Sequence, residues 1–136
     1  MNIDAAAAVL ALLAADTNLR VYDGMVPTDP TTGRPPPRPY VVIYAPVGLS
    51  TVHNLTGTSG ALEASIQTTC VGDTAESCRI VARRVKAALL DVVPVVSGRA
   101  SFPIRHEYSE PARVDNDVAP PVLFAVDRWL TQSVPA

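Results

Sequence analysis

The side chains that could do chemistry in this sequence are few, and they do not fall into a catalytic pattern. Ser50 stands in the segment Gly48-Leu49-Ser50-Thr51-Val52, which lacks the second glycine of a nucleophile elbow. His53 follows and could be considered as the base of that serine. A loop rich in Ser, Thr, Asn and Gly is, however, common without catalysis, because these residues favour turns. We therefore expect that the chain is not an enzyme.

Metal and phosphate sites are not indicated either. His53 and His106 are far apart, and no Cys or carboxylate stands at metal-ligand spacing from either. Asp115 and Asp117 offer fewer oxygens than the roughly six to eight that calcium takes. The Gly-Thr-Ser-Gly segment 57–60 lacks the Gly-Lys-Ser/Thr ending of a phosphate loop and precedes a strand pattern. The sequence predicts no metal and no cofactor.

A basic cluster is the strongest charge feature of the sequence. We define this basic cluster as Arg79, Arg83, Arg84 and Lys86. One interpretation is a solvated helix face on which Glu76 pairs with Arg79. The other is a contact surface for an acidic neighbour, which makes the cluster a candidate interface.

A second candidate interface lies in the polar loop 48–60. Its residues are His53, Asn54, Leu55 and Thr56. Asn54-Leu55-Thr56 also matches a glycosylation sequon, which has no meaning in a cytosolic protein.

Length and charge narrow the class of protein. A chain of 136 residues suits a single domain, residues 1–136, with a thin core that further burial in an oligomer would stabilise. Apolar residues make up 48%, which excludes a disordered chain. The formal net charge of −2 argues against a general binder of nucleic acid or membrane surfaces, which needs a basic excess.

The cysteines and the N-terminus favour a cytosolic setting. Cys70 and Cys78 are too few for a disulfide scaffold, so we expect them to be reduced and buried. The apolar run 5–15 follows Asp4, which is the wrong charge for a signal peptide, and it is shorter than the roughly 20 residues of a membrane span. We expect no targeting segment and no transmembrane helix.

Two helices are expected. Asp4 is a good N-cap for residues 5–15, which are strong helix formers. Asp73 with Glu76 forms a variant capping box for a second helix, which we expect to reach about Asp91. Apolar residues in this helix follow the i, i+3, i+4 spacing of a buried face, and they include Val81, Val85 and Leu89.

Five strands are expected, at residues 21–24, 40–45, 62–71, 100–108 and 122–131. The segments 27–39, 48–60 and 109–121 are rich in turn formers and are predicted as loops. Strands 40–45 and 62–71 should pair as a hairpin. In strand 122–131 we expect Phe124 and Val126 to face the helices together with Ile66. The fold class is α+β, a mostly antiparallel sheet of four to five strands with two helices packed on one face.

Three features carry a resemblance to a known family. A short N-terminal helix of the Ala-Leu-Leu-Ala type leads into residues 19–24, Leu-Arg-Val-Tyr-Asp-Gly. A proline-rich turn is then followed by residues 38–43, Arg-Pro-Tyr-Val-Val-Ile. The strand pattern 62–69 finally runs into a helix that contains residues 82–89, Ala-Arg-Arg-Val-Lys-Ala-Ala-Leu. In these features the chain resembles the tail terminator, or tail completion, proteins of long-tailed bacteriophages, and the last strands agree in kind.

The resemblance implies a structural virion protein without catalytic residues. Proteins of that family form a homohexameric ring on the finished tail tube, end its polymerisation and present a surface to the head-side connector. The implied partners are further copies of the chain, the tail tube protein and the connector, with DNA only passing through the pore. The implied location is the tail–head junction of a virion assembled in the host cytoplasm, with no membrane contact. The alternatives are another head–tail connector or neck protein, or a small hydrolase or ligand-binding domain.

Overall fold

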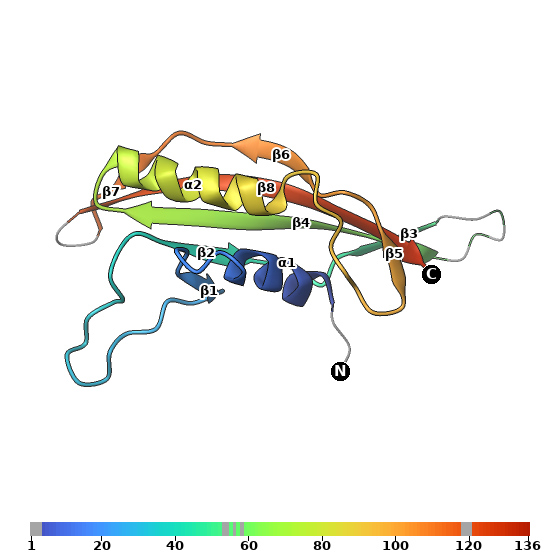
Figure 1. Cartoon of the computed structure of the whole chain (residues 1–136), viewed down its shortest axis with the longest axis horizontal. Helices are drawn as coiled ribbons and strands as arrows, with labels where there is room; N and C mark the ends of the chain where they lie inside the picture. Colours follow the sequence, from blue (N-terminus) through green and yellow to red (C-terminus); the bar gives the residue numbers. More distant parts are fainter. Residues whose placement is uncertain (1–3, 53–54, 56, 58, 118–120) are drawn as a thin grey trace.

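Two helices pack against one face of a single sheet in the computed structural model, which describes residues 4–52, 55, 57, 59–117 and 121–136 (Figure 1). The elements are α1 (Ala5–Ala14), β1 (Val21–Asp23), β2 (Tyr40–Tyr44), β3 (Leu49–Val52), β4 (Ser59–Gly72), α2 (Ala75–Leu89), β5 (Arg99–Ser101), β6 (Arg105–Ser109), β7 (Arg113–Asp115) and β8 (Val122–Pro135). Among the described residues the sheet has eight strands. Our prediction of four to five strands is therefore wrong, although the class remains α+β.

Short strands account for the difference in strand number. β3 and β7 lie in segments 48–60 and 109–121, which we predicted as loops. The single strand predicted at 100–108 is divided into β5 and β6, on either side of Pro103. Proline lacks the N–H that a ladder needs, so the strand is interrupted there. These strands have only three to five residues, too few for alternation to be visible in the sequence.

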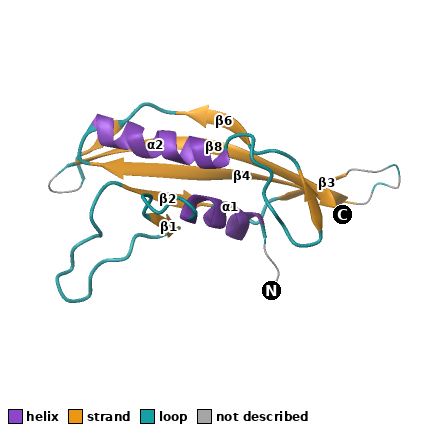
Figure 2. Cartoon of the chain, viewed as in Figure 1, coloured by secondary structure: helices purple, strands orange, loops and turns teal. Residues whose placement is uncertain are grey.

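The sheet is built around two long antiparallel strands, β4 and β8, of 14 residues each (Figure 2). β2 and β3 pair one after the other with the outer side of β4, which confirms the predicted hairpin of 40–45 with 62–71. β5, β6 and β7 pair in the same manner with β8. β1 is parallel to β2, whereas the other pairings are antiparallel.

Helix α2 begins one residue later than predicted. Thr74 is its N-cap, and a capping box joins Thr74 and Ser77, each side chain accepting from the other's backbone N–H. Asp73 instead lies 2.7 Å from Nε of Arg38, in the proline-rich segment. The helix ends at Leu89, earlier than the predicted Asp91. Its buried residues are those of the predicted apolar face: Cys78, Val81, Val85 and Leu89.

The core lies between the two helices and the sheet. α1 begins at its predicted cap, where Oδ1 of Asp4 accepts the Ala7 N–H at 2.8 Å. The helices and strands together bury a cluster of apolar side chains: Val9, Leu13, Leu19, Val41, Ile43, Ile66, Cys70, Val81, Val85, Leu89, Ile104 and Trp129. No helix in the described part of the chain is long and apolar enough to cross a membrane.

The helix-facing side of β8 is the opposite of the predicted one. Trp129 and Asp127 are buried, with exposures of 1% and 5%, and Trp129 pairs with Ile66 of β4. Phe124 and Val126, which we expected beside Ile66, lie half-buried on the other face. Because side chains alternate along a strand, one wrong assignment reverses every position. By expecting Phe124 and Val126 to face the helices, the prediction left Asp127 and Trp129 on the opposite face.

Candidate binding groove

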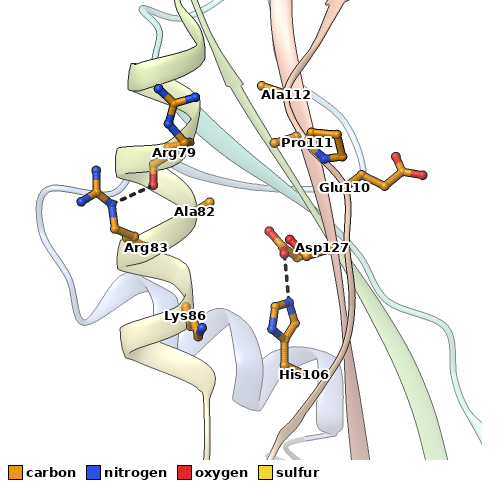
Figure 3. A pocket seen from close by; sticks show the side chains of 11 residues that line it. Arg79, Ala82, Arg83, Lys86, His106, Glu110, Pro111, Ala112 and Asp127 are labelled. Atoms are coloured by element: carbon orange, nitrogen blue, oxygen red, sulfur yellow. Dashed lines mark hydrogen bonds and ion pairs between the residues drawn. The ribbon is translucent and has the colours of Figure 1, made fainter.

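An open groove of about 380 Å3 lies between helix α2 on one side and strands β6 and β8 with the segment after β6 on the other (Figure 3). The residues that line it are Arg79, Ala82, Arg83, Lys86, His106, Ser109, Glu110, Pro111, Ala112, Ala125 and Asp127. One wall is thus basic, the other is built from residues 109–112, and a carboxylate lies at the bottom.

Helix α2 supplies the basic wall. Three members of the basic cluster, Arg79, Arg83 and Lys86, line the groove on the flank of the helix next to its buried stripe (Figure 3). Within the described residues none of the three makes an ion pair, and the predicted pair of Glu76 with Arg79 is not formed. Neighbouring cations on one helix repel. This wall therefore favours a carboxylate brought by a ligand or partner.

Arg84, the fourth member of the cluster, has a different role. Its Nη1 lies 3.2 Å from Oδ1 and 3.0 Å from Oδ2 of Asp16, just after the end of α1. The backbone N–H of Asn18 and the Arg84 guanidinium together lower the pKa of Asp16 below its ordinary value. Arg84 thus ties the two helices together and does not line the groove.

The opposite wall contains one carboxylate, Glu110, which is already paired with neighbouring side chains. The carboxylate of Glu110 accepts a hydrogen bond from the Tyr108 hydroxyl and lies 2.5 Å from Nη2 of Arg113. These two partners, Tyr108 first, lower the pKa of Glu110 below its ordinary value. Figure 3 shows its side chain pointing away from α2. Glu110 therefore does not compensate the positive charge of the basic wall.

The floor of the groove is a hydrogen-bonded chain that reaches into the core. Oδ1 of Asp127 lies 2.9 Å from Nε2 of His106, which joins β6 to β8. The His106 ring stacks on Trp129, with centroids 4.3 Å apart, and Trp129 Nε1–H donates to Thr68 Oγ1 at 3.0 Å. A buried carboxylate is costly without a partner, and His106 supplies that partner.

The groove holds an imidazole paired with a carboxylate. An imidazole oriented by a carboxylate is part of hydrolytic triads, but it needs a nucleophile within hydrogen-bond reach. Ser109 lines the same groove, and none of the described hydrogen bonds joins it to His106. No group of three or more metal-ligating side chains occurs in the part of the chain that the structure describes. The groove offers positive charge and donors to an acidic partner.

Leu55 is the one residue of the second candidate interface that the structure describes, since His53, Asn54 and Thr56 lie outside the described residues. Leu55 lies in the turn between β3 and β4, is fully exposed and does not line the groove.

Sequence reasoning missed the floor of the groove. The sequence offered no partner for His106 at short spacing, and we expected the face of strand 122–131 opposite Asp127 to meet the helices, whereas His106 and Asp127 are bonded partners on adjacent strands. The available signal was the spacing of Asp127 and Trp129, which places both on one face of a strand. A tryptophan on that face indicates burial.

The cysteines agree with the prediction. Cys70 and Cys78 are both buried and unpaired. Burial raises the pKa of each thiol above its ordinary value of 9.0. Both thiols are therefore protonated at neutral pH and behave as small apolar side chains.

Comparison with known proteins gives one kind of match. No family model matches the chain, and no curated protein matches it. Among solved structures, the chain is similar to a chain of a structure described as the virion of a native gene transfer agent particle. The TM-score is 0.64, the sequence identity is 21%, and the match covers 98% of this chain and 96% of the other. At this identity the likeness shows a shared fold.

Proposed function

We propose that the chain is a structural protein of a phage-like virion, and that it acts there by assembly and not by catalysis. The observation that carries the proposal is the extent of the fold match. A chain of a gene transfer agent virion accounts for 98% of this chain, with only 4% of its own length left over. The match thus spans nearly the whole length of both chains.

Within the virion, we infer a ring of six copies that caps the tail tube. This finer role rests on the resemblance of residues 19–24, 38–43, 62–69 and 82–89 to tail terminator proteins. The ring would end tube polymerisation and offer a surface to the head-side connector, while DNA passes through the pore. Contacts between neighbours in such a ring are heterologous, with one side of a subunit meeting a different side of the next.

The basic wall of the groove supports a role in assembly. Arg79, Arg83 and Lys86 have no acidic partner within the described residues and flank an open groove. An interface with an acidic neighbour would relieve their repulsion and steer the encounter.

The decisive experiment removes the protein from particles. A null strain should produce tails of irregular length that do not join heads, and the parent gene supplied in trans should restore both properties. Tails of normal length that fail to join heads would instead assign the chain to another neck protein. Tails of normal length that join heads would exclude both roles.

The absence of catalysis has its own test. Ser109→Ala removes the serine hydroxyl of the groove and should leave particle number and infectivity or gene transfer unchanged. A strong loss despite normal assembly would favour the hydrolase alternative.

A further inference from the structure

The far end of the sheet is a four-stranded arm. Strands β3, β4, β8 and β5 lie side by side there, and we call this part of the sheet the arm (Figure 1). A single row of paired residues crosses all four strands: Ser50, Leu62, Ser133 and Ser101. Within the described residues β3 pairs only with β4 and β5 only with β8. The arm therefore ends in an open strand edge on each side.

The two edges combine some of the features that protect open strands with exposed apolar side chains. β3 and β5 are short, β3 has an irregular register between Thr51 and Val52, and β5 begins with Arg99. β3 reads Leu-Ser-Thr-Val, without a charge or a proline, and Leu49 and Val52 are 67% and 59% exposed. On the other side Phe102, directly after β5, is 50% exposed. Open edges that carry exposed apolar side chains are nevertheless surfaces on which another chain can add a strand.

Side-chain hydrogen bonds order the arm, so its edge strands have a defined position. The Arg99 side chain of β5 reaches across β8, with Nε 2.6 Å from Oγ of Ser133 and Nη2 2.5 Å from the carbonyl oxygen of Gly60 in β4. The Phe102 N–H donates to the Gln132 carbonyl of β8, and the Gly98 carbonyl accepts from the Ala136 N–H directly after β8. By the alternation of an antiparallel ladder, the backbone groups of Ser101 therefore face outward. An edge that is already ordered loses little entropy on binding.

We propose that β3 of one copy pairs with β5 of the next copy, so that the sheet continues from subunit to subunit. Strand direction supports this pairing. Adjacent strands of the arm are antiparallel, so β3 and β5, the first and last of four, run in opposite directions. Head-to-tail joining of β5 to β3 of the next copy is therefore antiparallel again. A closed ring joined in this way satisfies both edges of each copy. The inference rests on the proposed ring and names its contact.

Engineered cysteines test the pairing directly. Residues opposite each other on antiparallel strands have Cα atoms about 4.5–5.5 Å apart, within the range of about 4.4–6.8 Å that disulfides span. Ser50→Cys is combined with Ser101→Cys and, to cover the neighbouring register, with Arg99→Cys. The native cysteines are buried and do not interfere. Mild oxidation of assembled protein should give a ladder of covalent oligomers up to the full ring, whereas each single variant should give none.

Other outcomes overturn the pairing in distinguishable ways. Dimers from Ser50→Cys alone would mean that β3 pairs with β3 about a twofold axis. Rings without cross-links in either double variant would place the contact elsewhere and leave the proposed function intact. A parent that neither forms rings nor occurs in particles would reject both proposals.

Edge charges give an independent test. Ser50→Lys with Thr51→Lys should shift the assembled parent to monomer, because lysines on an edge oppose strand pairing. Thr31→Lys with Thr32→Lys, in the exposed proline-rich segment, adds the same charge and should leave assembly unchanged. Equal assembly of both variants would overturn the pairing.

Discussion

Strands β4 and β8 pass through two different surroundings. At one end, which we call the body, α2 packs on both strands, and Ile66, Cys70 and Trp129 are at most 1% exposed. At the other end, the arm, the same strands pair with β3 and β5, and polar side chains make several of the contacts. Arg99 binds Ser133 and Gly60 there, and Thr131 donates to the Ala64 carbonyl at 3.2 Å.

The difference separates stability from assembly. The body has a closed apolar core, so a change there acts on the free energy of unfolding. The arm has two open edges and little apolar burial, so a change there should act on contacts between copies. The groove lies beside the body, but its basic wall is exposed, and it should behave like the arm.

The largest effect is expected from a charge in the body. Val85→Asp places a carboxylate where the exposed fraction is 0%, and an unpaired buried charge costs about 3–5 kcal/mol or more. We expect no folded protein, as measured by circular dichroism. Ile80→Asp, on the same helix but 43% exposed, is the matched control and should fold. A folded Val85→Asp variant would contradict the core described above.

The second prediction concerns alkaline pH. Burial raises the pKa of Cys70 above 9.0, so above that pH the unfolded chain loses this proton while the folded chain keeps it. The unfolded state then binds fewer protons, and stability falls by about 1.4 kcal/mol per pH unit for this thiol. Below pH 9.0 its contribution is fully present.

Urea denaturation at several pH values checks this effect. Cys70→Ala should be less stable at neutral pH but should show a shallower loss above pH 9.0 than the parent. An equal slope in both proteins would mean that Cys70 is accessible to solvent.

The body was largely predictable from the sequence, and the arm was not. Helical spacing identified Val81 and Val85, and alternation identified Ile66, because each pattern is long enough to fix a face. β3 and β5 have four and three residues, so their pairing depends on β4 and β8 and not on local pattern. Only the tertiary structure brings them to one end of the sheet.

Part of the candidate site, the basic cluster, was predictable from the sequence, whereas the floor of the groove was not. The basic cluster was visible because four cations on one helix stand out locally. Its division into three groove residues and the Arg84–Asp16 pair depends on how α1 meets α2. The floor depends on His106 and Asp127, which are 21 residues apart and meet only through the pairing of β6 with β8.

The third prediction tests the arm alone. Gly48 precedes β3 with φ at +107°, and a Cβ there would lie 2.9 Å from the carbonyl oxygen of Glu63. Gly48→Ala should therefore loosen β3 from β4 at a cost of about 1–2 kcal/mol. Hydrogen exchange should become faster at residues 61–63 and remain slow at residues 66–70. Faster exchange over both segments would mean that arm and body unfold together.

The smallest effect on stability, and the sharpest separation of roles, is expected in the basic cluster. Arg83 lines the groove without an ion pair in the described residues, whereas Arg84 binds Asp16 at 3.0 Å. Arg83→Glu should leave the melting temperature unchanged and weaken assembly, and added salt should weaken assembly of the parent as well. Arg84→Glu should instead lower the melting temperature slightly, because it sets two carboxylates against each other at an exposed site. Native mass spectrometry and thermal melts of both variants measure the two properties separately. If both variants assemble as well as the parent, the groove is not an intersubunit or tube contact, and the interface must be sought at the arm alone.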